Sequence, residues 1–503
     1  MKQLILSEWL LTQLNHYKFP TRMANHRRIY ETIRRAVTEQ ILPSGSRLPS
    51  SRSLATDLNV SRNTILAAFD QLLDEGYVDA ITGSGTYVCF KTDMPFKQVG
   101  NKAENLTSPA ANHINKQITL SKRGMAASSS PDNLQNGHEV QPFSPGEDDY
   151  SRFPFALWRR LLNRHWRALN PALLDSSHDG GYLPLRKAIA DYLRVSRAVN
   201  LTVNQVIITS GTQQSIDLCA RLLTDEGDIA WVENPCYWAA RRVLEVNGLQ
   251  LHPVAVDSEG MAPSTEDFRV KPRLIYTTPS HQYPKGIVMS YGRRRLLLDY
   301  AENQQAWMIE DDYDSEFRFE GRPISSLQGM DQHNRVLYLG TFSKVMYPGI
   351  RLGYMVVPLQ LVNAFKNGLY ELQRPGQVMI QAALADFIEE GHFASHIRRM
   401  RLTYAERRRL LQTALAPISN VGARLSPVDS GLHLVVEFDA EIDDVKVATL
   451  AAQQGLRVYP LSNYCFGNQP EKGLIIGYAY AATNGITQYG NVLADVIQTA
   501  LKN

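Results

Sequence analysis

Apolar and polar positions change their spacing along the chain, and this change divides it into zones. Within residues 1–90 apolar side chains recur every three or four positions, as Ile33, Val37 and Ile41 do. This period is typical of amphipathic helices. Beyond residue 142, short β-rich runs alternate with helical stretches; these runs are 205–210, 228–233, 273–278, 306–311 and 336–341. Such alternation over 142–503 predicts an α/β domain with a mainly parallel sheet.

The stretch between these zones, residues 91–141, is polar, rich in Ser, Asn and Pro, and poor in aromatic side chains. Such a segment buries too little apolar surface to offset the entropy lost on ordering it. The sequence therefore predicts three parts: a helical N-terminal domain at 1–90, a flexible linker at 91–141, and the α/β domain at 142–503.

A helix-turn-helix pattern lies within the first zone. Ser50 or Ser51 is placed to cap one helix, Asn59 to end that helix in a turn, and Ser61 to cap the next. The glycines of "DAITGSGTYV" then predict two short strands around a turn. Helices and hairpin in this order predict a winged helix-turn-helix. The alternative is a small helical domain in which caps and hairpin serve only folding.

The start of the second helix carries the candidate DNA-binding side chains. It reads Ser61-Arg62-Asn63-Thr64, which puts short or forked hydrogen-bonding groups at the end that enters a major groove. The segments "GSRLPSSRSLATDLNVSRNTILAAFDQLLDEGYV" and "GSGTYV" resemble the winged helix of the GntR regulators across 28–88. This resemblance implies double-stranded DNA as a partner. It implies contacts from Arg52, Ser61, Arg62, Asn63 and Thr64, with the wing residues Gly83, Ser84 and Gly85 near the minor groove.

Composition changes this picture little. The chain has 503 residues and a formal net charge of +3, so DNA binding has to come from local placement of charge. Its four cysteines form no CxxC pair, which argues against a disulfide framework or a zinc site and agrees with a reducing compartment. The N-terminus has no signal-peptide pattern, and no apolar run approaches the ~18 residues of a membrane helix. We therefore expect a cytoplasmic protein.

The segment "YLGTFSKVMYPGIRLGY" places Lys344 directly after a predicted strand. A lysine that is partly desolvated at such a strand end has a lowered pKa, and its neutral amine attacks an aldehyde to form a Schiff base. Arg351 follows with the forked donor that binds a phosphate. In isolation the two would be interpreted as a surface lysine and an ion-paired arginine.

Three further features accompany Lys344. Ser210-Gly211-Thr212 lies between a predicted strand and a helix, where backbone N–H groups form a natural phosphate seat. Tyr237 follows another strand and offers a ring for stacking. Because side chains alternate along a strand, Ile309, Asp311 and Tyr313 share one face, with Asp311 placed for a pyridinium nitrogen and Tyr313 for a phenolate oxygen.

Together these features are what pyridoxal 5′-phosphate requires as a cofactor, and 142–503 resembles the fold-type I aminotransferases. This resemblance implies that Lys344 carries the internal aldimine, Asp311 pairs with the ring nitrogen, Tyr313 holds the ring oxygen and Tyr237 stacks on the ring. It assigns the phosphate to Ser210, Gly211, Thr212, Thr341, Ser343 and Arg351. The segment "TTPSHQYPKG" stands where many aminotransferases have an Asn-containing turn. His281 and Gln282 therefore either lie beside the ring or have only a core or loop role.

A GntR winged helix, a linker and an aminotransferase-like domain together resemble the MocR (GabR-type) subfamily of bacterial transcriptional regulators, typically head-to-tail homodimers. The resemblance implies a regulator, not an enzyme, that senses pyridoxal phosphate or an amine or amino-acid-like effector through an aldimine at Lys344. Its target genes would serve vitamin B6 or amine and amino-acid metabolism, and a dimer would bind an operator with two half-sites. One alternative is an active aminotransferase with an accessory DNA-binding domain; another is a DNA-binding protein with an empty large domain.

One position departs from the aminotransferase pattern. These enzymes place an arginine for the substrate α-carboxylate in a strand that corresponds here to "GLIIGYAY", where the aligned residue is Ile475, or Ile476 after a one-residue shift. Trp238-Ala239 likewise supplies no arginine after Tyr237, where the GABA-responsive relative has one. We therefore expect an effector other than GABA held in that way: pyridoxal phosphate itself, or an amine without a conventional carboxylate. Arg374 is a candidate replacement for the missing arginine.

Overall fold

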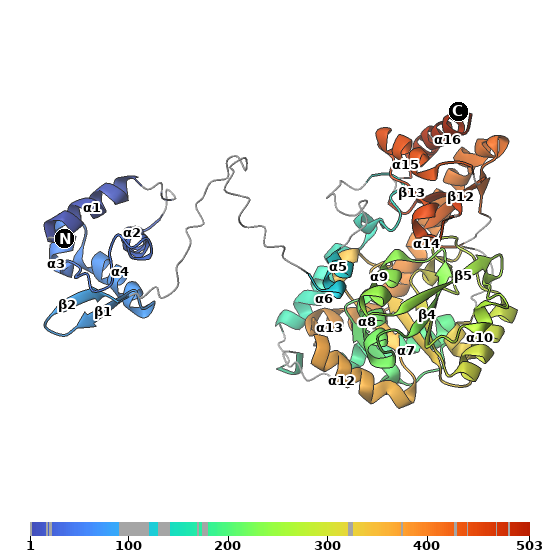
Figure 1. Cartoon of the computed structure of the whole chain (residues 1–503), viewed down its shortest axis with the longest axis horizontal. Helices are drawn as coiled ribbons and strands as arrows, with labels where there is room; N and C mark the ends of the chain where they lie inside the picture. Colours follow the sequence, from blue (N-terminus) through green and yellow to red (C-terminus); the bar gives the residue numbers. More distant parts are fainter. Residues whose placement is uncertain are drawn as a thin grey trace. The chain divides into compact units, whose positions relative to one another are not determined.

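The computed structural model describes residues 3–16, 19, 23–89, 120–128, 141–167, 171–173, 180–319, 325–373, 376–426, 430–439, 441–468, 470–480 and 483–502. The chain divides into two compact units, Met1–Gln117 and Ile118–Asn503 (Figure 1). Within the predicted linker, residues 120–128 are described and contain helix α5 (Lys122–Ser128), which packs against α9 (Trp238–Val246) of the second unit. The rest of 91–140 lies outside the described residues.

The N-terminal unit has the expected winged helix. Its elements are α1 (Gln3–His16), α2 (Asn25–Thr38), α3 (Ser51–Asp57), α4 (Arg62–Asp74), β1 (Val78–Ile81) and β2 (Gly85–Val88). The two strands pair antiparallel, and the helices enclose one apolar core that contains Ile33, Leu54 and Ile65. Helix α1, which the sequence did not predict, adds Leu10 to this core.

The turn between α3 and α4 forms as its capping residues predict. The Ser50 side chain accepts a hydrogen bond from the Ser53 N–H, which settles the open choice between Ser50 and Ser51 as the cap. Asn59 adopts the left-handed conformation with φ 51°, which stops α3. The Ser61 side chain then caps α4.

An eight-stranded sheet forms the centre of the second unit, in the order β3-β10-β9-β8-β7-β4-β5-β6. The strands are β3 (Val206–Thr209), β4 (Ile229–Asn234), β5 (Gln250–Asp257), β6 (Gly260–Met261), β7 (Leu274–Thr277), β8 (Trp307–Asp312), β9 (Val336–Thr341) and β10 (Gly353–Val356). Strands β5, β4, β7, β8 and β9 are mutually parallel, whereas β10 is antiparallel to both of its neighbours. The predicted α/β fold with a mainly parallel sheet is therefore confirmed.

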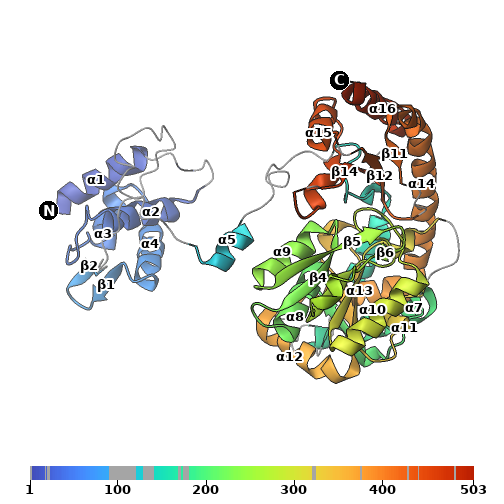
Figure 2. The same ribbon diagram turned by 45° about the vertical axis from the view of Figure 1, so that its right-hand side comes forward.

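Helices cover both faces of this sheet (Figure 2). The helices are α6 (Phe155–Arg167), α7 (Leu183–Arg197), α8 (Thr212–Leu223), α9, α10 (Tyr291–Gln304), α11 (Leu327–Met330), α12 (Val362–Gln373), α13 (Val378–Glu389) and α14 (His392–Leu415). Side chains of α8, α9 and α12 share one apolar cluster with the sheet, while α7 and α13 pack in a second cluster and α10 in a third. Both faces are thereby buried, as a parallel sheet requires. Within the described residues, no helix is long and apolar enough to span a membrane.

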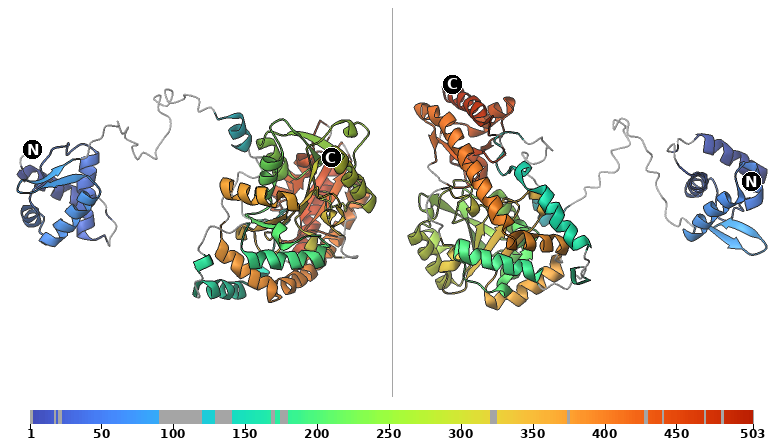
Figure 3. Two further views of the ribbon diagram at one scale, coloured as in Figure 1. Left: turned by 90° about the horizontal axis from the view of Figure 1, so that it is seen from below. Right: turned by 180° about the vertical axis from the view of Figure 1, so that it is seen from behind.

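A smaller antiparallel sheet follows, in the order β11-β12-β14-β13, with helices α15 (Asp444–Gln453) and α16 (Ile486–Lys502). Its strands are β11 (Arg424–Leu425), β12 (His433–Phe438), β13 (Tyr459–Pro460) and β14 (Lys472–Gly477). Figure 3 shows α14, in orange, running from the large sheet to this C-terminal lobe, where it packs against α16. Only β14 of this sheet was expected from the sequence.

The carboxyl ends of β3, β4, β7, β8 and β9 meet at one edge of the large sheet, where α/β proteins bind their ligands. At this edge Gly353 of β10 pairs with Thr209 on one side and with Thr341 on the other. A Cβ on Gly353 would lie only 2.8 Å from Gly211 Cα, so this glycine lets the turn after β3 close onto β10. The turns after β3 and β9 are thus brought together.

Candidate functional site

Lys344 lies in the turn after β9, at this edge of the sheet. Its Nζ donates a hydrogen bond to the Gly146 carbonyl and lies 3.8 Å from Asp148 Oδ2. The Lys344 side chain is 27% exposed, whereas that of Asp148 is 4% exposed. Burial raises the pKa of Asp148 to about 7, and the nearby Lys344 ammonium opposes the rise. Neither neighbour was predicted, because nothing in the sequence links Gly146 or Asp148 to a lysine so distant along the chain.

Asp311 lies at the end of β8 and is 2% exposed. Its Oδ2 accepts a hydrogen bond from the Tyr276 hydroxyl at 2.7 Å, whereas its buried Oδ1 has no hydrogen-bond partner among the described residues. Burial raises the pKa of Asp311 to about 7. An unpaired buried carboxylate oxygen is a strong acceptor without a donor, and the protonated nitrogen of a pyridine ring is a donor of the kind it lacks. Tyr276 carried no sequence signal.

The acids on either side of Asp311 point to the other face of β8, as strand alternation predicts. Glu310 accepts hydrogen bonds from the backbone N–H groups at the start of α11. Asp312 forms a buried ion pair with Arg197, with 2.8 Å between its Oδ2 and the guanidinium Nε. Both neighbours therefore have structural partners. Asp312 Oδ1 also lacks a hydrogen-bond partner, but Asp312 is paired with a cation, whereas Asp311 forms no ion pair within the described residues.

Tyr313 contacts His281 twice. Its hydroxyl donates to the His281 carbonyl at 2.9 Å and lies 2.9 Å from Nδ1. The same Nδ1 lies 3.0 Å from Asp314 Oδ2, while the buried Nε2 has no partner among the described residues. The His281 ring packs closely against Gly431. A Cβ added to Gly431 would lie only 1.9 Å from His281 Cε1, so this packing depends on the glycine. His281 therefore lies beside Tyr313.

Gln282 has a different environment. Its side-chain amide donates to Glu233 at 3.2 Å and to the Pro235 carbonyl at 2.9 Å. Glu233 is itself buried and accepts further hydrogen bonds from Thr277 and Thr278. These contacts tie the 277–286 turn to the end of β4, which is a loop-holding role.

Several aromatic rings pack close to Tyr237, the residue that precedes α9. The Tyr283 ring lies 5.4 Å from Tyr237, 5.8 Å from Tyr313 and 5.3 Å from His433, measured between centroids. Burial and the nearby Asp311 raise the pKa of Tyr237. Burial, His281 and Lys344 lower the pKa of His433 to about 3, so this histidine is neutral. Neither Tyr283 nor His433 was predicted from the sequence, since no local pattern marks them.

The turn after β3 and the segment after β9 hold the predicted phosphate residues. Gly211, with φ 125°, precedes α8, and nothing lies within 4 Å of where its Cβ would be. The Ser343 N–H donates to Thr341 Oγ1 at 3.2 Å, which folds the turn before Lys344. Arg351 is exposed, adopts φ 48°, and forms no ion pair or hydrogen bond with any described residue. An open turn at a helix N-terminus and an arginine without a carboxylate partner match the needs of a phosphate.

Strand β14 brings no arginine to this edge. Ile475 packs with Val435, Leu461 and Tyr464 in a small cluster that also contacts Tyr283. Ile476 points the other way, into the main core. The register that faces the aromatic rings is therefore that of Ile475. Arg374 lies outside the described residues.

In the N-terminal unit, Arg62 and Asn63 are exposed at the start of α4, and Arg52 is exposed on α3. Arg62 Nε donates to the Ser51 hydroxyl at 3.3 Å, and Thr64 contacts the Ser61 hydroxyl at 2.8 Å. One face of the helix pair therefore carries these polar groups, as the predicted DNA interface requires.

The wing turn contains Gly83 with φ 77° and Gly85 with φ 127°, both in a region that favours glycine. Between them, the Ser84 hydroxyl contacts the Tyr87 hydroxyl at 2.7 Å. The exposed Arg47 lies against this turn, with its Nε 3.0 Å from where a Cβ on Gly85 would be. Arg47 was not predicted from the sequence, because its place beside the wing depends on folding.

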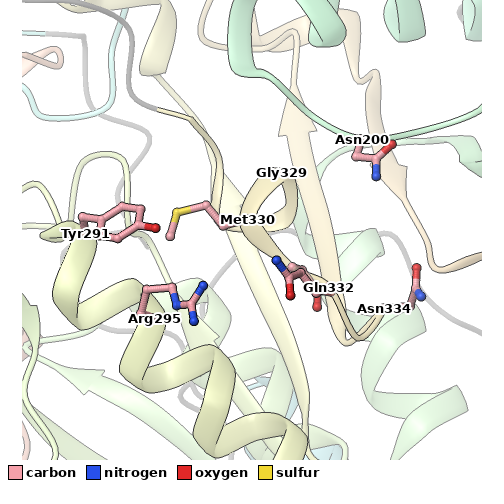
Figure 4. A pocket seen from close by; sticks show the side chains of 8 residues that line it. Asn200, Tyr291, Arg295, Gly329, Met330, Gln332 and Asn334 are labelled. Carbon is pink, nitrogen blue, oxygen red and sulfur yellow. The ribbon is translucent and has the colours of Figure 1, made fainter.

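A polar cleft of about 460 Å³ lies elsewhere on the second unit (Figure 4). Its lining residues are Asn200, Tyr291, Arg295, Gly329, Met330, Asp331, Gln332 and Asn334. It shares no residue with the cluster around Lys344.

Comparison with known proteins places these features in a family. The bacterial regulatory protein gntR family matches residues 25–88, and aminotransferase class I and II matches residues 147–473. The probable rhizopine catabolism regulatory protein MocR of Rhizobium meliloti is 40% identical over 454 residues, which cover 90% of each chain. The pyridoxine biosynthesis transcriptional regulator PdxR of Corynebacterium glutamicum is 33% identical over 448 residues, covering 89% of this chain and 90% of PdxR.

A solved structure of kynurenine aminotransferase from Pyrococcus horikoshii superposes with a TM-score of 0.70 at 25% identity, covering 76% of this chain and 98% of that one. The fold and site thus define a winged-helix regulator joined to an aminotransferase-like domain, whose aminotransferase relatives depend on pyridoxal phosphate. The chain belongs to the MocR-type subfamily of the GntR transcriptional regulators.

Proposed function

We propose that this transcriptional regulator binds pyridoxal 5′-phosphate at Lys344 and responds either to that cofactor or to an amine that reaches it. The observation that carries the proposal is the unpaired Oδ1 of Asp311, because a buried carboxylate oxygen without a donor favours the protonated nitrogen of the cofactor ring. Bound pyridoxal phosphate supplies an aldehyde that condenses with primary amines. Lys344 is the amine of this chain that is placed for it.

The other residues of the site hold the cofactor. Tyr237 packs against the ring face, and Tyr313 contacts the ring oxygen, with its hydroxyl oriented by His281. The phosphate is held by Ser210, Gly211, Thr212, Thr341, Ser343 and Arg351. Arg351 provides the only positive charge in this set, which makes it the strongest single contributor to phosphate binding.

The environment of Ile475 supports an effector without a conventional α-carboxylate. Within the described residues, β14 has one cation, Lys472, and this lies 3.6 Å from Asp444. A carboxylate next to Ile475 would lack the charge-assisted hydrogen bonds that an arginine gives, worth ~1.5–3 kcal/mol each. This supports an amine or pyridoxal phosphate itself as the signal, and genes of vitamin B6 or amine metabolism as the targets.

DNA binding is assigned to α3, α4 and the wing. Arg62, Asn63 and Thr64 would contact bases or phosphates in the major groove, with Arg52 on the backbone and the turn 83–85 near the minor groove. A head-to-tail homodimer would present two such units to two operator half-sites. Regulation of this kind takes place in the cytoplasm, where the DNA lies.

The experiment that tests the cofactor site is substitution of Lys344. In Lys344→Ala the amine that would bind the aldehyde is absent, so the protein mixed with pyridoxal phosphate is expected to lose the visible absorbance band of the bound cofactor. Lys187→Ala, which removes an exposed lysine on α7, is the matched control and should keep the band. A band that persists in Lys344→Ala after removal of free cofactor would contradict the assignment.

A second function, catalytic transamination, is favoured by one observation: the aminotransferase-like edge of the sheet retains Lys344, Asp311 and Arg351. It predicts sustained turnover when an amino donor and an oxo-acid are supplied together. A regulator without turnover predicts at most one spectral change per bound cofactor. A steady-state assay of product formation distinguishes the two functions.

A further inference from the structure

The segment 141–149, which we name the strap, passes directly over Lys344. It is held on both sides: the Gly477 N–H donates to the Phe143 carbonyl at 2.9 Å, and Arg407 forms an ion pair with Asp149 at 2.6 Å. A Cβ on Gly477 would lie 2.4 Å from the Ser144 carbonyl oxygen, so this end of β14 closely contacts the strap. The position of the residues between these anchors is therefore well defined.

Asp148 is the strap residue that faces Lys344. Its Oδ2 lies 3.8 Å from Lys344 Nζ, its side chain is 4% exposed, and neither carboxylate oxygen has a hydrogen-bond partner among the described residues. The adjacent Asp149 is satisfied by Arg407. Asp148 is thus a buried acid without a donor, placed next to the amine on which the chemistry of the site depends.

An amine that replaced Lys344 on the cofactor aldehyde would form one C–N bond while the bond to Lys344 Nζ breaks and the lysine leaves as a free amine, so the nitrogen of the incoming amine would come close to the place of Lys344 Nζ. The carboxylate carbon of an α-amino acid lies only about 2.5 Å from that nitrogen, as N–Cα and Cα–C bond lengths require. Such a carboxylate would come close to Asp148, and two anions that near repel strongly at the low dielectric of a buried site. Within the described part of the chain, β14 also supplies no arginine to offset the repulsion, because Ile475 stands where one is expected.

We propose that Asp148 selects the effector, admitting primary amines that lack an α-carboxylate, diamines among them, and rejecting α-amino acids. This inference rests on the proposed function, since it requires pyridoxal phosphate at Lys344. It adds the chemical class of the ligand and the residue that determines it. Asp148 is a specificity-determining residue that acts through its charge, so the discrimination is expected above pH 7, where this carboxylate is ionised.

The test uses the full-length protein loaded with pyridoxal phosphate and pairs of ligands that differ only in the α-carboxylate: tyramine with tyrosine, and putrescine with ornithine. The readout is the shift of the visible absorbance band during titration. The wild-type protein is expected to respond to each amine at a concentration at least about tenfold lower than to its amino acid, a modest effect for two close anions. Equal responses, or a preference for the amino acids, would overturn the inference without any variant.

Two variants test whether Asp148 is the residue that causes the preference for amines over amino acids. Asp148→Asn keeps the shape and removes the charge, so the preference should fall to within about threefold. Glu147→Gln removes the neighbouring, more exposed charge and should leave the preference unchanged. An unchanged preference in Asp148→Asn would refute the role of this residue. If the wild-type protein forms no visible band with pyridoxal phosphate, the proposed function fails as well; a normal band without discrimination overturns this inference alone.

Discussion

At the scale of single residues, the placement of Asp311 distinguishes it from the acids around it. Glu310 is held by the N–H groups at the start of α11, and Asp312 is paired with the Arg197 guanidinium, although its Oδ1 has no hydrogen-bond partner among the described residues. Asp311 keeps one buried oxygen without a donor, at an energetic cost that folding alone does not explain. A buried acid with a raised pKa at the ligand-binding edge of a sheet is a candidate functional group, and the proposed function assigns Asp311 to the ring nitrogen.

The Asp311→Asn variant tests that assignment. Removing the charge replaces a charge-assisted hydrogen bond of ~1.5–3 kcal/mol by a neutral one of ~0.5–1.5 kcal/mol. This difference of about 1–1.5 kcal/mol should lower the affinity for pyridoxal phosphate roughly 5- to 13-fold. The measurement is titration of the protein with pyridoxal phosphate, followed by absorbance. Asp299→Asn, an exposed acid on α10, controls for the loss of one negative charge. Unchanged affinity in Asp311→Asn would place the ring nitrogen elsewhere.

At the scale of elements, short polar caps determine where the helices of the winged helix begin. The Ser61 side chain accepts the Thr64 N–H at 3.2 Å and so starts α4 with Arg62 and Asn63 exposed in its first turn. The same residue thus sets both the stability of α4 and the position of its candidate DNA-binding side chains.

In Ser61→Ala this cap is lost, which costs ~1 kcal/mol and should lower the melting temperature of the N-terminal unit by several degrees. DNA affinity should fall as well, because the first turn of α4 frays. Ser61→Asn retains a capping oxygen and should restore most of the stability. Melting is followed by circular dichroism and DNA binding by fluorescence anisotropy. Equal stability of Ser61→Ala and the wild type would show that the first turn does not depend on the cap.

At the scale of the whole molecule, the chain consists of two compact units with separate apolar cores. All the residues assigned to the cofactor lie in the second unit, and all those assigned to DNA in the first. Binding to one folded unit stabilises that unit by mass action.

Calorimetry of the full-length protein should therefore show two thermal transitions. Pyridoxal phosphate at 100 times its dissociation constant stabilises its unit by about 2.7 kcal/mol, so only the larger transition should move to higher temperature. Operator DNA should move the smaller one. A cofactor that raised both transitions equally would show that the units unfold as one.

Local patterns predicted much of the fold and part of the site. The five β-rich runs became β3, β4, β7, β8 and β9, and Asn59 forms the expected turn. These features depend on neighbouring residues, which a sequence displays directly. The sequence did not predict α1, the antiparallel β10 or most of the smaller sheet, because short or weakly patterned segments acquire their structure from tertiary contacts.

The residues of the site also fall into two groups, those that local patterns predicted and those that they did not. Strand alternation alone put Asp311 and Tyr313 on one face, and the motif around Lys344 predicted this residue as the reactive amine. Tyr276, Asp148 and Gly431 were not foreseeable, since each is distant in sequence from the residue it contacts. The close approach of Gly431 to His281 follows only from chain packing.

The sequence by itself determined the two-part architecture, the strand-and-helix alternation and the identity of the chemical groups, because period, caps and turns are local properties of the chain. Only the tertiary structure decided which groups meet. It placed a buried acid from the strap beside Lys344, and it turned Ile475 rather than Ile476 toward the aromatic rings. Contacts between distant segments depend on strand order and on the space that each side chain leaves for another, and neither is written in any local pattern.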